Sequence, residues 1–498
     1  MKYLPFIVLV GLLLYLPSLR NGFVWDDEEQ IVNNSAIRSF SNIPLLFTGS
    51  TFNSGGAALS GQYYKPLMPM MFTMIYSLAG DAPWAFHLVQ TVLHIANAVM
   101  VFALMYFFIK NTAYASVAAF IFLIHPIQVE AVVYSSALQD VLFFFFGMSA
   151  LLWIVISGKT IRWYDYCLAG LLVLCSLLSK ETGILFVIII GVYMLLYQKR
   201  MQGVWWATTS FLVLCLYGFL RIGVAGIAFR SNSFTPIAAL GLMDRLSHAP
   251  AIVWHYIHTF LFPWQLSIGQ HWVISQVGFV SFYVPLLFSC ITLILIVWWG
   301  RRIHVTHYWF FFAWFLVGLG AHLQIIPLDM TVADRWFYVP MVGLVGMMGS
   351  IKLKVKSSEF IKVMMGIVFV ALFIRSSVRI HNWRDGMTLY VHDIHSMSES
   401  FDVQNNYGVE LFRAKNYDEA KFHFQKSTDL APLWWTNWNN LGVIVEREGD
   451  LDTALVYYKK AMDNGGYYLA YENYASLIIK RDEHEKALRE LKRYANEK

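Results

Sequence analysis

The sequence predicts an all-α protein that combines a polytopic membrane bundle with a C-terminal α-solenoid. Of its 498 residues, 57% are hydrophobic and only 14% are charged, whereas soluble domains average about 25% charged residues. Apolar runs long enough to cross a bilayer recur throughout residues 1–380. Residues 400–498 instead repeat with a period of about 34 residues. These observations predict about eleven transmembrane helices followed by helical repeats.

The apolar run Tyr3–Leu19 is predicted to be the first transmembrane helix. No small-residue cleavage site precedes Asn21, so a removed signal peptide is not expected. Residues 21–82 form a long first outer loop, with a short apolar helix at the membrane interface beginning near Tyr63. The other predicted spans are 84–109, 113–124, 137–157, 164–178, 184–197, 204–220, 282–299, 306–325, 336–350 and 360–376. His125-Pro126 should end one of them, because the residue before proline disfavours the α conformation.

The distribution of Lys and Arg predicts the orientation of these spans. With the N-terminus in the cytoplasm, every inward-facing turn is basic, as the positive-inside rule requires. These basic residues are Lys110, Lys159, Arg162, Lys199, Arg200, Arg301, Arg302, Lys352, Lys354 and Lys356. An odd number of spans then places everything after Arg379 outside. The excess positive charge is explained by membrane orientation and gives no indication of nucleic-acid binding.

The C-terminal part, residues 400–498, has the pattern of tetratricopeptide repeats, and a linker of residues 381–399 separates it from a membrane domain of residues 1–380. Two clear repeats and a degenerate third share a polar block, a small residue and an aromatic residue at matching positions. The matches are Asn405 to Gly408 with Asn439 to Gly442 and, more weakly, Asn473 to Ser476; Ala420 with Ala454 and Ala487; and Phe424 with Tyr458. A generic helical tail does not explain this set. Such repeats form concave surfaces that hold peptides or proteins.

Four consecutive acidic residues follow the first predicted span, and Asp26 and Asp27 begin them. A carboxylate within the hydrocarbon costs about 2.5–3.5 kcal/mol, so both should lie just outside the span. Partial desolvation there raises the pKa of a carboxyl group and makes it a proton acceptor near neutral pH. In the alternative interpretation, the acidic residues only mark the end of a membrane helix.

Three outer-loop cations, Lys180, Arg335 and Arg221, are candidates for binding a phosphate. An Arg can grip phosphate oxygens with two donors, whereas a Lys acts as a point charge. Each cation also has a structural alternative. Lys180 could pair with the adjacent Glu181, and Arg335 with the adjacent Asp334. For Arg221 the alternative is that its side chain merely extends from a span end to the membrane surface and binds no phosphate.

Other polar residues of the outer side are expected to support this site or the bundle. Glu130 and Asp140 position an acceptor, orient Lys180 or satisfy buried backbone donors. His94 and Asn97 lie on one face of a span, where interhelical hydrogen bonding is the commoner role.

Several motifs occur in order along nearly the whole chain. They are Trp25-Asp26-Asp27; Tyr64-Lys65-Pro66-Leu67; Phe86-His87-Leu88 with His94 and Asn97; His125-Pro126 with Glu130 and Asp140; Ser179-Lys180-Glu181-Thr182-Gly183; Asp334 to Pro340; and Asn382-Trp383-Arg384-Asp385 before the repeats. This ordered set resembles the transmembrane and tetratricopeptide repeat (TMTC-like) O-mannosyltransferase family, in a prokaryotic form. That family belongs to the C-type glycosyltransferase (GT-C) superfamily.

The resemblance implies transfer of a sugar, expected to be mannose, from a polyprenyl-phosphate carrier to protein Ser or Thr on the extracytoplasmic face. An acidic pair in the first outer loop supplies the base in that superfamily, so Asp26 is the first choice and Asp27 the second. Direct attack at C1 inverts the anomeric configuration, and outer cations stabilise the departing phosphate. The repeats would recruit the polypeptide acceptor. The expected supporting residues are Glu130, Asp140, Glu181, Asp334, Tyr64, Lys65 and His94.

The implied location is a prokaryotic plasma membrane with the repeats outside, or the endoplasmic reticulum membrane in a eukaryote. Two positions depart from the family, which usually carries Arg where this chain has Lys65 and Leu138. A different sugar or carrier lipid is therefore left open. A non-catalytic membrane-anchored repeat scaffold is the second hypothesis. A transporter or lipid flippase is the third, although it would favour charges near the middle of spans.

No cofactor or divalent metal is expected, because a monophosphate carrier beside Lys and Arg does not require one. The absence of a Gly-rich phosphate loop favours a lipid-linked sugar over a nucleotide sugar as donor. The four cysteines all lie in apolar runs, which suits neither a disulfide framework nor a metal site. They are Cys167, Cys175, Cys215 and Cys290.

Overall fold

The computed structural model describes residues 3–51, 63–228, 235–351, 359–465 and 468–481, together with single positions between 485 and 493. Throughout these residues the regular elements are helices, and the β-pairing is limited to an isolated bridge between Gln270 and Val332. The prediction of an all-α protein is confirmed. Ala487 and the predicted inner-turn residues 352, 354 and 356 lie outside the described residues.

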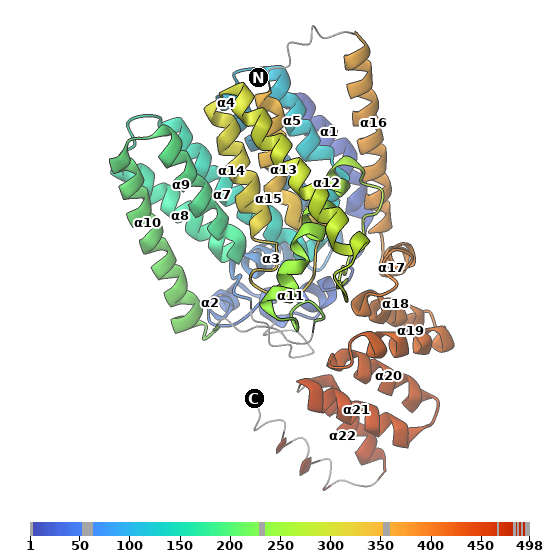
Figure 1. Ribbon diagram of the computed structural model, residues 1–498. Coiled ribbons are helices and arrows are strands. Elements are labelled where there is room, and N and C mark those ends of the chain that lie inside the picture. The colour runs from blue at the N-terminus through green and yellow to red at the C-terminus, as the bar shows by residue number, and fades with distance from the viewer. Residues whose placement is uncertain are drawn as a thin grey trace.

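Each predicted apolar run forms a helix (Figure 1). The helices are α1 (Leu4–Tyr15), α4 (Pro83–Ile109), α5 (Thr112–Ile124), α7 (Leu138–Ser157), α8 (Trp163–Ser179), α9 (Ile184–Tyr197), α10 (Arg200–Gly218), α13 (Val284–Ile303), α14 (Thr306–Gly320), α15 (Tyr338–Ser350) and α16 (Glu359–Asn382). Local chemistry sets the ends of α5. Its N-cap Asn111 accepts hydrogen bonds from the N–H groups of Ala113 and Tyr114. The helix stops before His125-Pro126, as predicted.

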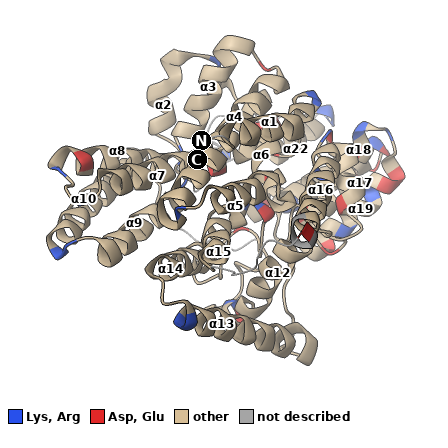
Figure 2. Cartoon of the chain, turned by 90° about the horizontal axis from the view of Figure 1, so that it is seen from above, with Lys and Arg blue, Asp and Glu red and all other residues tan. Residues whose placement is uncertain are grey.

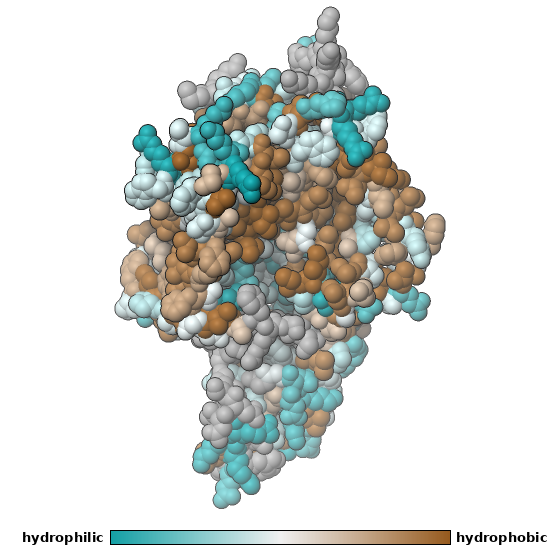
Figure 3. Space-filling model, turned by 60° about the vertical axis from the view of Figure 1, so that its left-hand side comes forward, coloured by the Kyte–Doolittle hydropathy of each residue, from teal (hydrophilic) through white to brown (hydrophobic). Residues whose placement is uncertain are grey.

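Within the described residues, five helices are long and apolar enough to cross a membrane, or six if a bent pair counts as one span. They are Pro83–Ile109, Ser135–Ser157, Arg200–Val224, Phe279–Ile303 and Val363–Asn382, and the bent pair joins Thr112–Ile124 to Pro126–Val133. Figure 3 shows a hydrophobic band across the visible face, with hydrophilic surface above it and on the C-terminal helices below it. The protein is an integral membrane protein.

Short elements gather at the end of the bundle that carries the C-terminal helices (Figure 1). The first outer loop contains the short helical turn η2 (Glu28–Val32), then α2 (Ile43–Phe47) and α3 (Leu67–Ala79), the helix expected near Tyr63. The region 221–280 contains α11 (Leu242–Ser247) and α12 (Ala249–Leu261), which were not predicted. With 13 residues, α12 is too short to stand out as a span.

The C-terminal helices pack in succession. They are α17 (Gly386–Asp393), which lies in the predicted linker, then α18 (Phe401–Arg413), α19 (Tyr417–Leu430), α20 (Trp435–Arg447), α21 (Leu451–Gly465) and α22 (Tyr468–Lys480). A Cβ at Gly408 would lie 2.7 Å from the ring of Phe424, and one at Gly442 would lie 2.6 Å from that of Tyr458. The matched small and aromatic residues therefore pack on each other.

The C-terminal helices are joined to the bundle by polar contacts as well as by the chain. The Arg379 guanidinium of α16 donates to both carboxylate oxygens of Asp393 at 2.8 and 3.1 Å, and Asp393 also accepts from the N–H of Ile268 at 2.8 Å. Arg413 of α18 forms an ion pair with Glu28 at 2.6 Å. Figure 2 shows charged residues on α17–α19 and at helix ends, and few on the helices of the bundle.

Candidate active site

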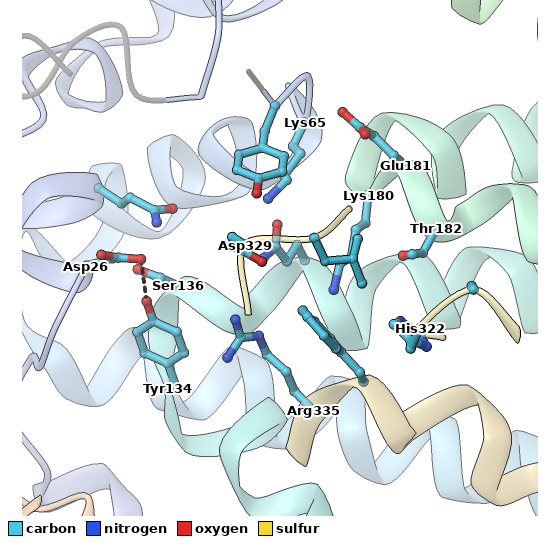
Figure 4. A pocket seen from close by; sticks show the side chains of 16 residues that line it. Asp26, Lys65, Tyr134, Ser136, Lys180, Glu181, Thr182, His322, Asp329 and Arg335 are labelled. Carbon is cyan, nitrogen blue, oxygen red and sulfur yellow. Dashed lines mark hydrogen bonds between the residues drawn. The ribbon is translucent and has the colours of Figure 1, made fainter. Parts of the chain in front are cut away.

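A cavity lies between the first loop and the adjoining helix ends (Figure 4), with about 830 Å³ of empty space including its open mouth. Segments far apart in the sequence form its wall. The lining residues are Asp26, Gln30, Tyr63, Lys65, Tyr134, Ser136, Gln139, Lys180, Glu181, Thr182, Ala321, His322, Leu328, Asp329, Arg335 and Trp336. Five of the predicted site residues are among them: Asp26, Lys65, Lys180, Glu181 and Arg335.

Asp26 is the carboxylate of the predicted acidic pair that reaches the cavity. It is half-buried, and its Oδ2 accepts a hydrogen bond of 2.9 Å from the Tyr134 hydroxyl (Figure 4). Burial raises the pKa of Asp26 to about 6, although the hydrogen bond from Tyr134 opposes that rise. A carboxylate with a pKa just below neutral is mostly ionised at pH 7 and is suited to accept a proton.

Asp27 instead holds the acidic loop in place. It is fully buried, is not among the lining residues and accepts three hydrogen bonds: from the Val24 N–H at 3.2 Å, and from the N–H and hydroxyl of Ser136 at 2.7 Å each. Burial raises its pKa to about 7, against the effect of these donors. Its carboxylate ties the acidic loop to the turn that follows Tyr134.

The residue before the base, Trp25, has a left-handed backbone with φ of 57°. Such a conformation is uncommon for a bulky residue and persists where the surroundings impose it. The Trp25 indole stacks on the ring of Tyr134 with centroids 5.2 Å apart, and the Arg335 guanidinium lies 5.9 Å from the Trp25 centroid. These contacts fix the direction in which Asp26 points.

Lys180 and Arg335 pair with distant carboxylates and not with their neighbours in sequence. Lys180 donates to buried Asp140, which is one of the roles expected for that acid. Arg335 forms an ion pair with buried Glu130, and its backbone N–H donates to the same carboxylate at 3.2 Å. The alternative of simple pairs between adjacent residues is wrong for both cations. Each cation forms an ion pair with a buried carboxylate that does not line the cavity.

Lys65 enters the cavity without such a partner: among the described residues no carboxylate forms an ion pair with it. Burial lowers the pKa of Lys65 to about 8, and the nearby charge of Lys180 acts in the same direction. Its Nζ lies 4.1 Å from the ring centroid of Tyr63. Its ammonium group is thus available to an anionic ligand.

Arg221 lies behind the cavity wall. Its guanidinium is 3% exposed and pairs with Glu181, and Nε donates to the carbonyl of Ile227 at 3.3 Å. A buried guanidinium with these contacts is not snorkelling, so that alternative is wrong. Because Glu181 also accepts from the Tyr64 N–H at 3.4 Å, Arg221 connects the walls of the cavity through a shared carboxylate.

The remaining predicted site residues lie elsewhere. Asp334 is buried and accepts from the Gln270 side chain at 3.3 Å. The Tyr64 hydroxyl donates to the Phe47 carbonyl at 3.1 Å. His94 lies between helices, 2.7 Å from the hydroxyl of Tyr338, which also accepts from Asn97 at 3.0 Å. The interhelical role expected for His94 and Asn97 is confirmed.

Eleven lining residues were not predicted as site residues, and four of these carry titratable side chains: Tyr63, Tyr134, His322 and Asp329. Figure 4 shows Asp329 in the middle of the cavity, with Lys65, Lys180 and Arg335 around it. Its signal in the sequence was its position in the outer loop that leads to Arg335. Tyr134 lies between Glu130 and Asp140, but an uncharged aromatic residue in an aromatic-rich chain gave no signal of its own.

Among the described residues, no group of three or more His, Cys, Asp or Glu side chains is placed to hold a metal ion. The expectation that no divalent ion is needed stays a prediction.

Comparison with known proteins shows which proteins the chain is similar to. No family model matches the chain. Human protein O-mannosyl-transferase TMTC3 is 21% identical over 473 residues, which cover 87% of this chain. The chain is similar to the TMTC protein O-mannosyl-transferases. Mouse TMTC3 is 30% identical over 39% of the chain, and the Caenorhabditis elegans protein O-mannosyl-transferase F38B6.6 is 26% identical over 47%. The matched stretches span 52%, 21% and 34% of the human, mouse and worm proteins, respectively, so the chain covers about half or less of these relatives.

Proposed function

We propose that this TMTC-like protein is an inverting glycosyltransferase that moves mannose from a polyprenyl-phosphate carrier to Ser or Thr hydroxyls of proteins. The observation that carries this proposal is the lining of one cavity by a carboxylate of raised pKa, Asp26, and by three cations, Lys65, Lys180 and Arg335. The names of the relatives support the reaction class and the sugar.

The reaction needs a base at one point of the cavity and positive charge at another. Asp26 takes the proton of the acceptor hydroxyl while the hydroxyl oxygen forms a bond to C1 of the sugar. The bond between C1 and the phosphate oxygen breaks, and polyprenyl phosphate leaves as an anion without needing a proton. Attack on the side opposite the leaving group inverts the anomeric configuration.

The cations have separate roles in this scheme. Lys180 and Arg335 are each held by a buried carboxylate, which fixes their positions but offsets part of their charge. Lys65 carries an ammonium group without an ion-pair partner among the described residues, so no directly bound carboxylate offsets its charge when phosphate develops its negative charge. We assign the first contact with the phosphate to Lys65 and Arg335, and a supporting role to Lys180.

We further propose that eleven helices cross the membrane, with the N-terminus in the cytoplasm and the cavity on the extracytoplasmic side. The basic inner turns support this orientation. Residues 1–380 then form the GT-C-type membrane domain, and residues 400–498 form tetratricopeptide repeats that recruit the polypeptide acceptor outside. No metal takes part.

The proposal is tested with the full chain in lipid vesicles, polyprenyl-phosphate mannose as donor and a Ser/Thr-containing protein as acceptor. Asp26→Asn keeps the shape of the side chain but removes the base, and we expect transfer to fall by about 10²–10⁴-fold. Asp81→Asn changes an exposed carboxylate of the same outer loop and serves as matched control with unchanged transfer.

Transfer by Asp26→Asn at the wild-type rate would exclude this mechanism. Retention of the cellular function by the C-terminal helices alone, on an unrelated membrane anchor, would instead favour the scaffold hypothesis. Activity that is lost with a chelator and restored by a divalent ion would overturn the metal-free scheme.

A further inference from the structure

The Asn382-Trp383-Arg384-Asp385 motif has no part in the proposed reaction, yet it contacts the loop that carries the base. Trp383 is fully buried between the end of α16 and α17. Its ring stacks on Tyr134 with centroids 5.4 Å apart and planes 28° apart. Tyr134 also stacks on Trp25, with planes 19° apart. The phenol that donates to Asp26 is thus packed against two indoles from different parts of the chain.

Backbone contacts on either side of Trp383 bind the same loop. The Asn21 side chain donates to the carbonyl of Ile380 at 3.1 Å, and the N–H of Gly22 donates to the carbonyl of Arg384 at 2.9 Å. The end of α16 and the start of the acidic loop therefore hold each other in register. The backbone on both sides of Trp383 is thereby fixed relative to the loop that carries Asp26.

Stacking, and not hydrogen bonding, is what the Trp383 side chain contributes. Its buried indole N–H has no acceptor among the described residues. The Arg379 guanidinium lies 5.6 Å from its ring centroid and is itself fixed by Asp393. An aromatic ring at this position is therefore supported on one side by a buried ion pair and supports Tyr134 in turn.

We propose that Trp383 is a positioning residue for the base: its ring holds Tyr134 in the orientation from which the phenol donates to Asp26. The segment that follows the last membrane helix thereby completes the active site. The inference rests on the proposed function, since it assigns no separate activity to Trp383.

The chemical consequence is a change in the protonation of Asp26. The hydrogen bond from Tyr134 favours the ionised carboxylate, and burial opposes ionisation. The other charged groups that act on Asp26 are Arg335, which favours ionisation, and Asp329 and Asp402, which disfavour it. Asp27 follows in the sequence, and Lys65, Lys180 and Glu181 line the same cavity. Shortening residue 383 therefore acts on Asp26 through Tyr134, whose ring also lies 6.0 Å from the Arg335 guanidinium.

The test compares pH profiles of kcat/KM for Trp383→Leu, Tyr134→Phe, the double variant and Trp383→Phe, in the full chain with the donor and acceptor above. Tyr134→Phe removes a hydrogen bond to the Asp26 carboxylate. The pKa of the acidic limb of its kcat/KM profile should therefore rise by about one unit. From a starting value near 6, transfer falls about fivefold at pH 6, about twofold at pH 7 and hardly at pH 8. Trp383→Leu should shift the profile in the same direction.

Two comparisons separate positioning from general damage. Trp206→Leu removes another buried indole, which donates to the Val187 carbonyl between α10 and α9, and should lower the melting temperature without shifting the acidic limb. Trp383→Phe keeps a ring and loses no described hydrogen bond, so it should restore most of the wild-type profile. In the Tyr134→Phe background, Trp383→Leu should add no further shift, because the hydroxyl on which it acts is gone.

An unshifted acidic limb in Trp383→Leu, or a shift that adds to that of Tyr134→Phe, would overturn the inference. If Trp383→Leu does not fold, Trp383→Met keeps an unbranched apolar side chain there and is expected to show the same shift. The proposed function is judged separately by Asp26→Asn. Loss of transfer in Asp26→Asn together with an unshifted Trp383→Met would reject only the role of Trp383.

Discussion

At the scale of single residues, two adjacent carboxylates have different tasks because their surroundings differ. Asp26 faces a cavity and receives one hydrogen bond, from a phenol. Asp27 is enclosed and receives three, two of them from backbone N–H groups. A carboxylate whose oxygens are all occupied by fixed donors cannot turn toward a substrate. The base is therefore assigned by accessibility, although burial raises the pKa of both groups.

Replacing Asp27 by Asn should destabilise the protein. One carboxylate oxygen becomes an NH₂ group that faces N–H or O–H donors, so at least one buried donor loses its acceptor. Such a loss costs about 1–3 kcal/mol. Thermal unfolding in detergent should show a lower melting temperature for Asp27→Asn and an unchanged one for Asp81→Asn. An unchanged melting temperature would contradict the structural role of Asp27.

At the scale of elements, the site depends on how closely α14 and α15 approach. Arg335 lies in the turn η10 (Asp334–Phe337), which leads directly into α15. A Cβ at Gly343 of α15 would lie 2.5 Å from the backbone nitrogen of Phe315 and 2.7 Å from the carbonyl oxygen of Phe311. These are backbone atoms of α14, which cannot move aside as a side chain could. The absence of a side chain at Gly343 thus fixes the position of the helix that carries Arg335.

Gly343→Ala should therefore push α15 away from α14 and cost about 1–3 kcal/mol of stability. Because η10 moves with α15, mannose transfer should also fall. Gly366 on α16 is the control: a Cβ there meets nothing within 4 Å, so Gly366→Ala should leave both quantities unchanged. Unfolding in detergent and the transfer assay measure the two effects. Equal behaviour of the two variants would contradict the importance of this contact.

At the scale of the whole molecule, a buried ion pair joins the bundle to the C-terminal helices. Arg379 at the end of α16 and Asp393 at the end of α17 are both almost fully buried. Asp393 also accepts from the N–H of Ile268, in the region between α12 and α13. Three separate segments thus meet at one carboxylate. Trp383 lies in the same connection, so the geometry of the base and the attachment of the C-terminal helices are coupled.

Arg379→Met should destabilise this junction by about 3–5 kcal/mol, because it leaves the Asp393 carboxylate buried without its cation. The double variant Arg379→Met, Asp393→Asn removes both charges and keeps an acceptor for the Ile268 N–H. It should therefore lose less stability than Arg379→Met. Arg384→Met, which breaks an exposed pair with Asp385, should change stability by at most about 0.5 kcal/mol. Limited proteolysis and thermal unfolding measure the effect. A double variant less stable than Arg379→Met would contradict this account.

The positions of the helices could be predicted from the sequence because the signals are local. The predicted span 184–197 coincides with α9, and His125-Pro126 ends α5 as expected. Asp26, Lys65, Lys180, Glu181 and Arg335 could also be singled out, because charged residues are rare in this chain and those kept beside apolar runs stand out. Membrane insertion penalises misplaced charge so strongly that composition alone indicates the class of protein.

The partners of those charges were decided only by the tertiary structure. Lys180 is adjacent to Glu181 in sequence but pairs with Asp140, and Arg335 is adjacent to Asp334 but pairs with Glu130. The choice between Asp26 and Asp27, the entry of Asp329 into the cavity and the stacking of Trp383 on Tyr134 depend on segments more than a hundred residues apart. The sequence determines which chemical groups are present and where each helix begins and ends. Burial and pairing are set by the packing of distant segments, and no local pattern encodes that.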